Sequence, residues 1–196
     1  IIVPKFEKEL GKTPLTGISL PIGSYLIHLS ASKYETLPLP IFIPRGEIYM
    51  NKSPISGMIE PVHLLEIGTV KEHECYVPGG WSLQGVPDFE NNPRRKCWVN
   101  SFIMKKFPIT NTEYIDFLND ISKNEGSKVA MEYANRNGGD ELIYETKSNN
   151  GPMIFFSPDN SRGTHPVVGI NYYQAEKYAQ WLTEKTGTTW RLPTTE

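Results

Sequence analysis

Residues 165–196 read "HPVVGINYYQAEKYAQWLTEKTGTTWRLPTTE", and this stretch predicts an amphipathic helix followed by a short strand. Asn171 is a favoured N-cap residue, Gln174 occupies the third helical position, and Gly187 is suited to end the helix. The apolar face that helical spacing predicts consists of Ala175, Tyr178, Ala179 and Leu182, with Trp181 beside it. After the helix, "TTWRLP" (residues 188–193) alternates in character and predicts a strand.

A second helix is predicted upstream, directly after Pro108. Thr110 and Glu113 have the spacing of a capping box, in which the hydroxyl accepts the backbone N–H of the glutamate and the carboxylate reaches back. The residues at helical spacing on one face are Tyr114, Phe117, Leu118 and Ile121. We therefore expect this helix to bury that face against a sheet. Residues 122–164 are polar and rich in turns, and they hold either a functional loop or short elements that pattern reading misses.

The N-terminal part of the chain has the two-residue period of strands. Tyr25, Ile27 and Leu29 alternate with residues 26, 28 and 30, which are Leu, His and Ser, and proline- and glycine-containing turns separate the runs. Further on, Pro78-Gly79-Gly80 must turn sharply, and a short strand is predicted at 81–83. The fold class expected is α+β. Its predicted parts are a small antiparallel β module over residues 1–55, a linker over 56–69 and a second domain over 70–196.

Composition excludes several classes of function. The chain has 196 residues and a formal net charge of -2, so no basic field predicts nucleic-acid binding, and no apolar run is long enough for a membrane span. Glycine and proline contribute 16 residues each, which favours short strands and many turns over long helices. Two cysteines are too few for a disulfide framework. One disulfide and two buried thiols both fit, and the thiols are favoured in a cytoplasmic protein, which is the location we expect.

Few residues carry candidate chemistry. The single candidates are Cys75, Cys97, Asp159 and His165, and they form no recognisable catalytic motif or metal-ligand spacing. A Cys–His nucleophilic pair is conceivable, but buried structural cysteines are more common. Residues 157–163 offer oxygen ligands without the spacing of a calcium loop. The sequence thus predicts no catalytic and no metal-binding residue in this chain.

Four segments in order resemble one family. "YVPGGWSLQG", "FIMKKFPITNTEYIDFLND", "HPVVGINYYQAEKYAQWLTEKTG" and "WRLPTTE" are similar to the signature segments of the formylglycine-generating enzyme family, also called the sulfatase-modifying-factor family. The likeness covers roughly residues 70–196 and implies a C-type-lectin-like fold. The residues that match the family signature, all expected to have structural roles, are Pro78, Gly79, Gly80, Asn111, Tyr114, His165, Pro166, Trp181, Arg191, Leu192 and Pro193.

The N-terminal module has a likeness of its own. "GKTPLTGISLPIGSYLIHLSASKYETLPLPIFIPRGE" (residues 11–47) resembles a PEGA domain, a small β module. A PEGA module beside a formylglycine-generating-enzyme-like domain is similar to the C-terminal region of bacterial proteins that begin with a serine/threonine kinase domain. The resemblance therefore implies a multidomain, kinase-type parent, although no kinase residues occur in this chain.

The resemblance also implies a continuation of the domain beyond residue 196. In the family, "RLPT" leads into another helix, whose cap would be Thr194, and then into a C-terminal half with the calcium sites and the two copper-binding cysteines. Cys75 and Cys97 lie in the wrong segments to replace those cysteines. We therefore expect a domain truncated at its C-terminus, with no cofactor of its own, whereas calcium or copper belongs to the complete domain. The missing half or a second chain is the expected partner.

The resemblance is compatible with two functions. The favoured one is a non-catalytic binding or regulatory region, whose ligand, a protein or a small molecule, stays open. The alternative is part of an oxygen-dependent oxidoreductase that acts on a cysteine of a sulfatase-like substrate, or of a related sulfoxide synthase. Fold resemblance alone does not separate them.

Overall fold

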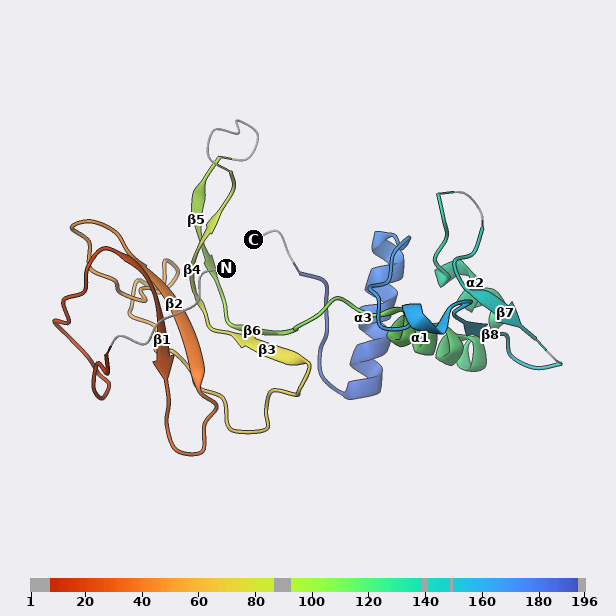
Figure 1. Cartoon of the computed structure of the whole chain (residues 1–196), viewed down its shortest axis with the longest axis horizontal. Coiled ribbons are helices and arrows are strands. Elements are labelled where there is room, and N and C mark those ends of the chain that lie inside the picture. The colour runs from red at the N-terminus through yellow and green to blue at the C-terminus, as the bar shows by residue number, and fades with distance from the viewer. Residues whose placement is uncertain (1–7, 87–92, 139–140, 149, 194–196) are drawn as a thin grey trace. The chain divides into compact units, whose positions relative to one another are not determined.

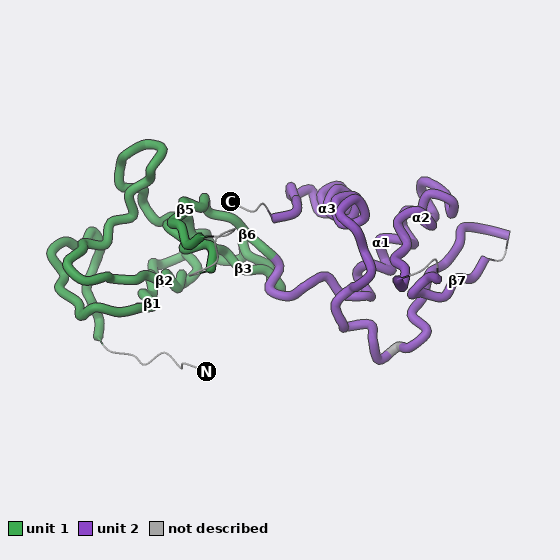
Figure 2. The backbone as a smooth tube through the Cα atoms, turned by 90° about the horizontal axis from the view of Figure 1, so that it is seen from above, with its two compact units in different colours: residues 1–104, 196 green, residues 105–195 purple. Residues whose placement is uncertain are grey.

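The structure, a computed structural model, describes residues 8–86, 93–138, 141–148 and 150–193. The chain forms two compact units that divide between Met104 and Lys105 (Figure 2). Both helices and small antiparallel strand pairs are present, so the α+β class is confirmed. The finer expectation of a C-type-lectin-like fold stays a prediction, as do the domain boundaries at residues 55 and 70.

The first unit contains the hairpin predicted near the N-terminus. Strand β1 (Gly23–Leu29) pairs antiparallel with β2 (Leu37–Ile43), from Gly23 opposite Ile43 to Leu29 opposite Leu37 (Figure 1). Burial alternates along β1, and the predicted inward positions 25, 27 and 29 are the half-buried ones. In β2, Pro38 and Pro40 lie opposite His28 and Leu26, and both prolines are exposed. The predicted alternation is confirmed.

Two further strand pairs lie in this unit. Strand β3 (Glu74–Val77) pairs with β6 (Phe102–Lys105), and β4 (Gly80–Gln84) pairs antiparallel with β5 (Arg95–Val99). The turn between β3 and β4 leaves little room for a side chain at Gly79, because a Cβ there would lie 3.1 Å from the backbone nitrogen of Ser101. Opposite each other in β4 and β5, Trp81 and Trp98 pack edge to face with ring centroids 5.7 Å apart.

The second unit is built on three helices. These are α1 (Asn111–Asn124), α2 (Ser127–Tyr133) and α3 (Tyr172–Thr186), as Figure 1 shows. Phe117 is fully buried at the centre, and its ring lies 5.5 Å from both Tyr178 and Trp181 of α3. Burying a side chain of this size contributes roughly 1.5–3 kcal/mol. The core of the unit consists of Tyr114, Phe117, Leu118, Ile121, Ala130, Ala134, Tyr144, Phe155 and Tyr178.

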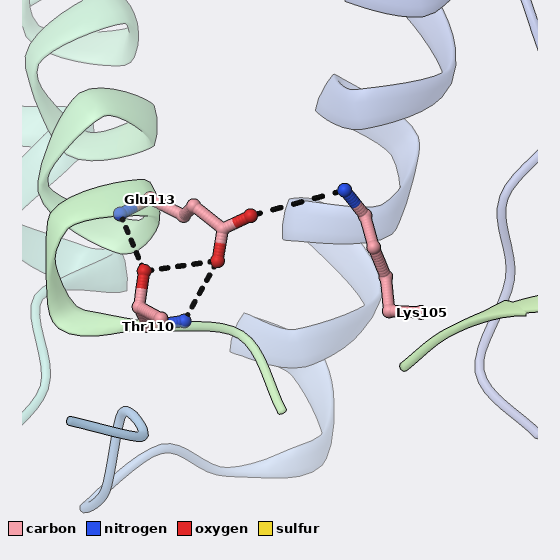
Figure 3. Close-up of polar contacts among 3 residues, drawn as sticks. All are labelled: Lys105, Thr110 and Glu113. Carbon is pink, nitrogen blue, oxygen red and sulfur yellow. Dashed lines mark hydrogen bonds and ion pairs between the residues drawn. The ribbon is translucent and has the colours of Figure 1, made fainter. Parts of the chain in front are cut away.

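The predicted capping box at Thr110 and the predicted N-cap at Asn171 are confirmed, and the second is also a capping box. At α1, the hydroxyl of Thr110 accepts the N–H of Glu113 at 3.3 Å, and the Glu113 carboxylate accepts the N–H of Thr110 at 2.9 Å (Figure 3). Lys105 approaches the other oxygen of that carboxylate at 3.8 Å. At α3, Asn171 and Gln174 make the same reciprocal pair, at 3.0 and 2.8 Å. These caps fix where each helix begins.

The segment between the two predicted helices holds short elements. Besides α2 it contains β7 (Glu145–Lys147) paired with β8 (Ile154–Phe156), and a 3-10 turn, η1 (Asn160–Arg162). The side chain of Asn119 on α1 accepts the N–H of Phe155 at 2.7 Å and donates to its carbonyl at 3.1 Å. The Asn119 amide thus bonds to Phe155 as a neighbouring strand would, and it fixes β8 to α1. The apolar face of α1, which was expected to lie against a sheet, packs largely against helices instead, since the Phe117 ring contacts Tyr133 of α2 and Tyr178 of α3.

The strand predicted at residues 188–193 is wrong. Trp190 donates its backbone N–H to the hydroxyl of Thr183 at 2.8 Å, and the same hydroxyl lies 3.2 Å from the carbonyl of Trp190. The Thr183 side chain therefore makes the backbone hydrogen bonds of Trp190 that a neighbouring strand would otherwise make. The predicted cap Thr194 lies outside the described residues. Within the described ranges, none of the helices has the length and apolar character that crossing a membrane requires.

Candidate functional site

The segment that contains Asp159 and His165 is fixed to the N-terminus of α1. The N–H of Asn111 donates to the carbonyl of His165 at 2.9 Å, and the N–H of Thr112 donates to the carbonyl of Gly163 at 3.0 Å. The side-chain amide of Asn111 adds a bond of 3.0 Å to the carbonyl of Arg162. Backbone amides that a helix leaves unpaired at its first turn are thereby satisfied by a loop 51 residues away in sequence.

Asn111 is the hub of this contact. Its side chain is 8% exposed, and its Oδ1 accepts the hydroxyl of Tyr144 at 2.7 Å. Burial raises the pKa of Tyr144 to about 12, and a hydrogen bond from the Asn135 side chain acts in the opposite direction. Tyr144 therefore keeps its proton at neutral pH and donates it to Asn111. A single buried amide ties α1, the strand region at Tyr144 and the loop together.

Asp159 and Arg162 form an exposed ion pair at the tip of the loop. Hydrogen bonds from Ser161 lower the pKa of Asp159, and the charges of Arg162 and His165 act in the same direction. The Asp159 carboxylate accepts the N–H of Ser161 at 2.9 Å and lies 3.4 Å from Nε of Arg162. The contacts of this carboxylate are therefore with its own loop. No group of three histidine, cysteine, aspartate or glutamate side chains that would suit a metal occurs in the described part of the chain.

His165 and Pro166 continue the loop along the residues before α1. The N–H of His165 donates to the carbonyl of Arg162 at 3.0 Å, and Pro166 forms an isolated antiparallel bridge with Thr110. Val167 then donates its N–H to the carbonyl of Ile109 at 2.9 Å. The backbone of this motif thus makes a short strand-like contact that continues the clamp on α1.

Two other signature residues, Tyr114 and Trp181, sit between helices. The hydroxyl of Tyr114 donates to the carbonyl of Tyr133 at 2.8 Å, and burial raises its pKa well above the ordinary value. The indole N–H of Trp181 donates to Asp120 at 3.1 Å, while Lys185 lies 4.3 Å above the Trp181 ring. These contacts orient α1, α2 and α3 and leave neither side chain free for a ligand.

The remaining signature residues lie apart from this cluster. Arg191 and Pro193 are exposed after α3, and Leu192 is half-buried. Pro78, Gly79 and Gly80 form the turn of the first unit that joins β3 to β4, with Gly80 as the first residue of β4. The signature therefore divides between the two units.

The two cysteines do not pair. Cys75 belongs to β3 and Cys97 to β5, which are members of different strand pairs, and both thiols are free and half-buried. The sequence left open either one disulfide or two thiols, and the structure has two thiols. Among the described residues, neither thiol hydrogen-bonds to a histidine, so the geometry offers no Cys–His nucleophile.

Sequence reasoning missed a pocket of about 240 Å³ in the first unit. One wall is a tight turn over residues 51–60, where Asn51 and Glu60 face each other: the N–H of Glu60 donates to the carbonyl of Asn51 at 2.7 Å, and the Asn51 amide donates back at 3.1 Å. The string "NKSPISG" (residues 51–57) was a signal for such a turn. The side chains and backbone that line the pocket include Asn51, Ser53, Ser56, Glu60, His63, Tyr76, Gly79, Trp98 and Asn100.

Comparison with known proteins identifies relatives of this chain. The family model described as the sulfatase-modifying factor enzyme 1-like domain matches residues 29–196. A curated relative, the uncharacterized protein YfmG of Bacillus subtilis (strain 168), is 27% identical over 123 residues, which is 58% of this chain and 23% of the relative. The chain thus spans less than a quarter of the length of that relative.

Proposed function

Since the chain belongs to the family of sulfatase-modifying factor enzyme 1-like domains, we propose that it serves as a binding or regulatory region of a larger bacterial protein and is not catalytic by itself. The observation that carries this proposal is the use to which the signature residues are put. The polar side-chain atoms of Asn111, Tyr114 and Trp181 form hydrogen bonds with other residues of the second unit. They act as scaffold, which leaves function to the surfaces that the scaffold holds.

The multidomain setting rests on the sequence. The likeness of residues 11–47 to a PEGA module favours a parent of the kinase-associated type. Two free thiols, Cys75 and Cys97, favour a reducing compartment and thus the cytoplasm. In this setting the β-rich unit is a contact module and the helical unit a rigid support.

The proposal includes a C-terminal continuation of the same domain that covers part of the first unit. Pairs of only two strands are marginal in water and gain stability from further strands or a packed helix. Exposed apolar side chains on these pairs include Trp81, Leu83, Phe102 and Met104. When this chain and the C-terminal continuation are expressed together as separate polypeptides, light scattering should detect one species that contains both. Dimerisation of the chain alone would instead assign this surface to a second copy.

The alternative function is an oxygen-dependent oxidoreductase whose catalytic half lies outside this chain. Family membership favours it, because the resemblance implies copper held by two cysteines in the complete domain. Cys75 and Cys97 do not match those cysteines, since they lie in other segments of the chain and belong to different strand pairs. We derive no chemical step from them.

An activity assay of the parent protein separates the two functions. The parent, supplied with calcium, copper and oxygen, would be incubated with a cysteine peptide of the sulfatase type, and the peptide mass would be followed. An unchanged cysteine is expected from the proposed function. Conversion of that cysteine to an aldehyde would overturn it and establish the oxidoreductase.

A further inference from the structure

We propose that the outward face of α3 binds a basic segment of a partner protein, with an arginine of that segment packed against Tyr172 and Tyr173. This inference rests on the proposed function, because it names the partner class of a non-catalytic binding region and places a contact surface on the helical unit. Three observations carry it: an exposed pair of perpendicular tyrosine rings, two carboxylates without an ion pair, and lysines of α3 that are paired elsewhere.

The outward face follows from helical geometry. Successive residues of an α-helix are about 100° apart, so five residues of α3 fall within an arc of about 120°. Four of them are exposed and one, at position 176, is half-buried. We call this set the α3 outward face, and it consists of Tyr172, Tyr173, Glu176, Gln180 and Glu184.

Two tyrosines form one end of the α3 outward face. Tyr172 is 62% exposed and Tyr173 is 74% exposed, and their ring planes meet at 84° with centroids 5.6 Å apart. Two aromatic rings at a right angle form a corner, and a cation in such a corner is attracted by both ring faces. Guanidinium suits this corner best, because it is planar, weakly hydrated and stacks on aromatic rings.

Glu176 provides negative charge beside the tyrosine corner. Its Oε1 accepts the hydroxyl of Tyr172 at 3.3 Å, and the charge of this carboxylate raises the pKa of Tyr172. The N-terminus of α3 opposes a cation only weakly, because that dipole effect is small at an exposed site, and the full charge of Glu176 outweighs it. An arginine against the rings therefore has a carboxylate within reach.

The lysines of α3 do not neutralise this face. Nζ of Lys177 lies 3.0 Å from the carboxylate of Glu125, and Nζ of Lys185 lies 3.8 Å from that of Asp120. Both acids belong to α1 or to its C-cap. Within the described ranges, neither carboxylate of the α3 outward face forms an ion pair. The face is therefore acidic, and a basic partner complements it.

Glu184 sets the length of the partner segment. It follows Glu176 by eight residues, which is about 12 Å along the helix. It also lies in the last turn of α3, where the helix dipole favours a cation. In an extended segment, residues four positions apart are about 13 Å apart. The segment that fits thus has two basic residues with three residues between them.

The test uses the full chain labelled with ¹⁵N and two synthetic peptides of equal charge. One peptide has two arginines separated by three alanines, and the other has the same residues with the arginines adjacent. Both are titrated to about 10 mM at low salt, since exposed charge pairs give affinities near the millimolar range. The first peptide should shift the backbone signals of residues 172–184 and bind about threefold more tightly than the second.

Variants tie the shift to the α3 outward face. Glu176→Gln, Glu184→Gln and Tyr173→Ala should each weaken binding about two- to fivefold. Glu145→Gln is the matched control, because it removes an exposed carboxylate from β7 of the same unit, and it should leave the affinity unchanged.

Four results would overturn the inference. They are no shift on α3 with either peptide, equal affinity of the two peptides, an equal loss in the Glu145→Gln control, and α3 signals that move with the concentration of the chain alone. The last result would assign the face to a second copy of this chain. None of them touches the proposed function, which the mass of the cysteine peptide reads separately.

Discussion

Replacement of Asn111 by alanine should destabilise the second unit by about 3 kcal/mol. The change removes the acceptor of the Tyr144 hydroxyl, a residue only 5% exposed. The hydrogen bond from Asn135 remains, but a buried O–H donor left without an acceptor costs roughly 1–3 kcal/mol. It also removes the 3.0 Å bond to the carbonyl of Arg162, worth about 0.5–1.5 kcal/mol. Alanine recovers a few tenths of a kcal/mol through its higher helix propensity.

The assay must report on the second unit alone, because two compact units need not unfold together. The native indole signal of Trp181, which belongs to α3, can be followed through a urea titration. A comparison variant is Asn111→Asp, which keeps an acceptor for Tyr144 but sets a buried carboxylate oxygen against the carbonyl of Arg162. It therefore does not isolate the loss of the amide donor and should destabilise the unit as well.

A double-mutant cycle decides whether the reasoning is right. Tyr144→Phe alone should cost about 1 kcal/mol, whereas in the Asn111→Ala background it should cost nothing or even restore stability, because the orphaned hydroxyl disappears. The coupling energy should therefore be about 1–2 kcal/mol. Strictly additive losses would show that the 2.7 Å bond between the two side chains does not hold the loop on α1.

Other contacts give three further predictions. Gly169 has φ +68 and a Cβ there would clash with the carbonyl oxygen of Arg136, so Gly169→Ala should cost more than about 2 kcal/mol in urea, whereas Gly138→Ala, which meets open space, should cost less than about 0.5 kcal/mol. Because the folded pKa of Tyr144 is raised to about 12, its contribution to stability is present below pH 10 and is lost as pH rises from about 10 towards 12; ultraviolet difference titration should show that late ionisation, which Tyr144→Phe abolishes. Thr110→Ala should lower stability by about 1 kcal/mol through loss of the α1 cap while Thr110→Ser stays near wild type, and equal melting curves for the two would show that the cap contributes nothing.

Local signals in the sequence predicted the parts of the fold that depend on neighbours in sequence. The capping boxes at Thr110 and Asn171 involve residues three positions apart, and the buried stripe of α1 repeats at helical spacing. The hub at Asn111 could not be predicted in this way. Its partners Tyr144 and Arg162 lie 33 and 51 residues away, and nothing in the string "ITNTEY" distinguishes a buried amide from a solvated one.

The errors have physical causes of the same kind. Alternation at residues 188–193 was correctly recognised, but a strand needs a partner ladder, and here Thr183 on α3 binds the backbone of Trp190 instead. The pocket escaped notice because its walls come from separate segments, 51–63, 76–79 and 98–101.

The two prolines of β2 determine how the first hairpin can associate. Proline has no N–H, so the ladder with β1 keeps all its donors only if Pro38 and Pro40 turn their nitrogen atoms away from β1. The outer edge of β2 then lacks two of the donors that an added strand would need, while the edge of β1 keeps its own. Strand addition is therefore possible on one side only. Two copies could join through their β1 edges as a closed pair, and fibre growth through this hairpin would stop there.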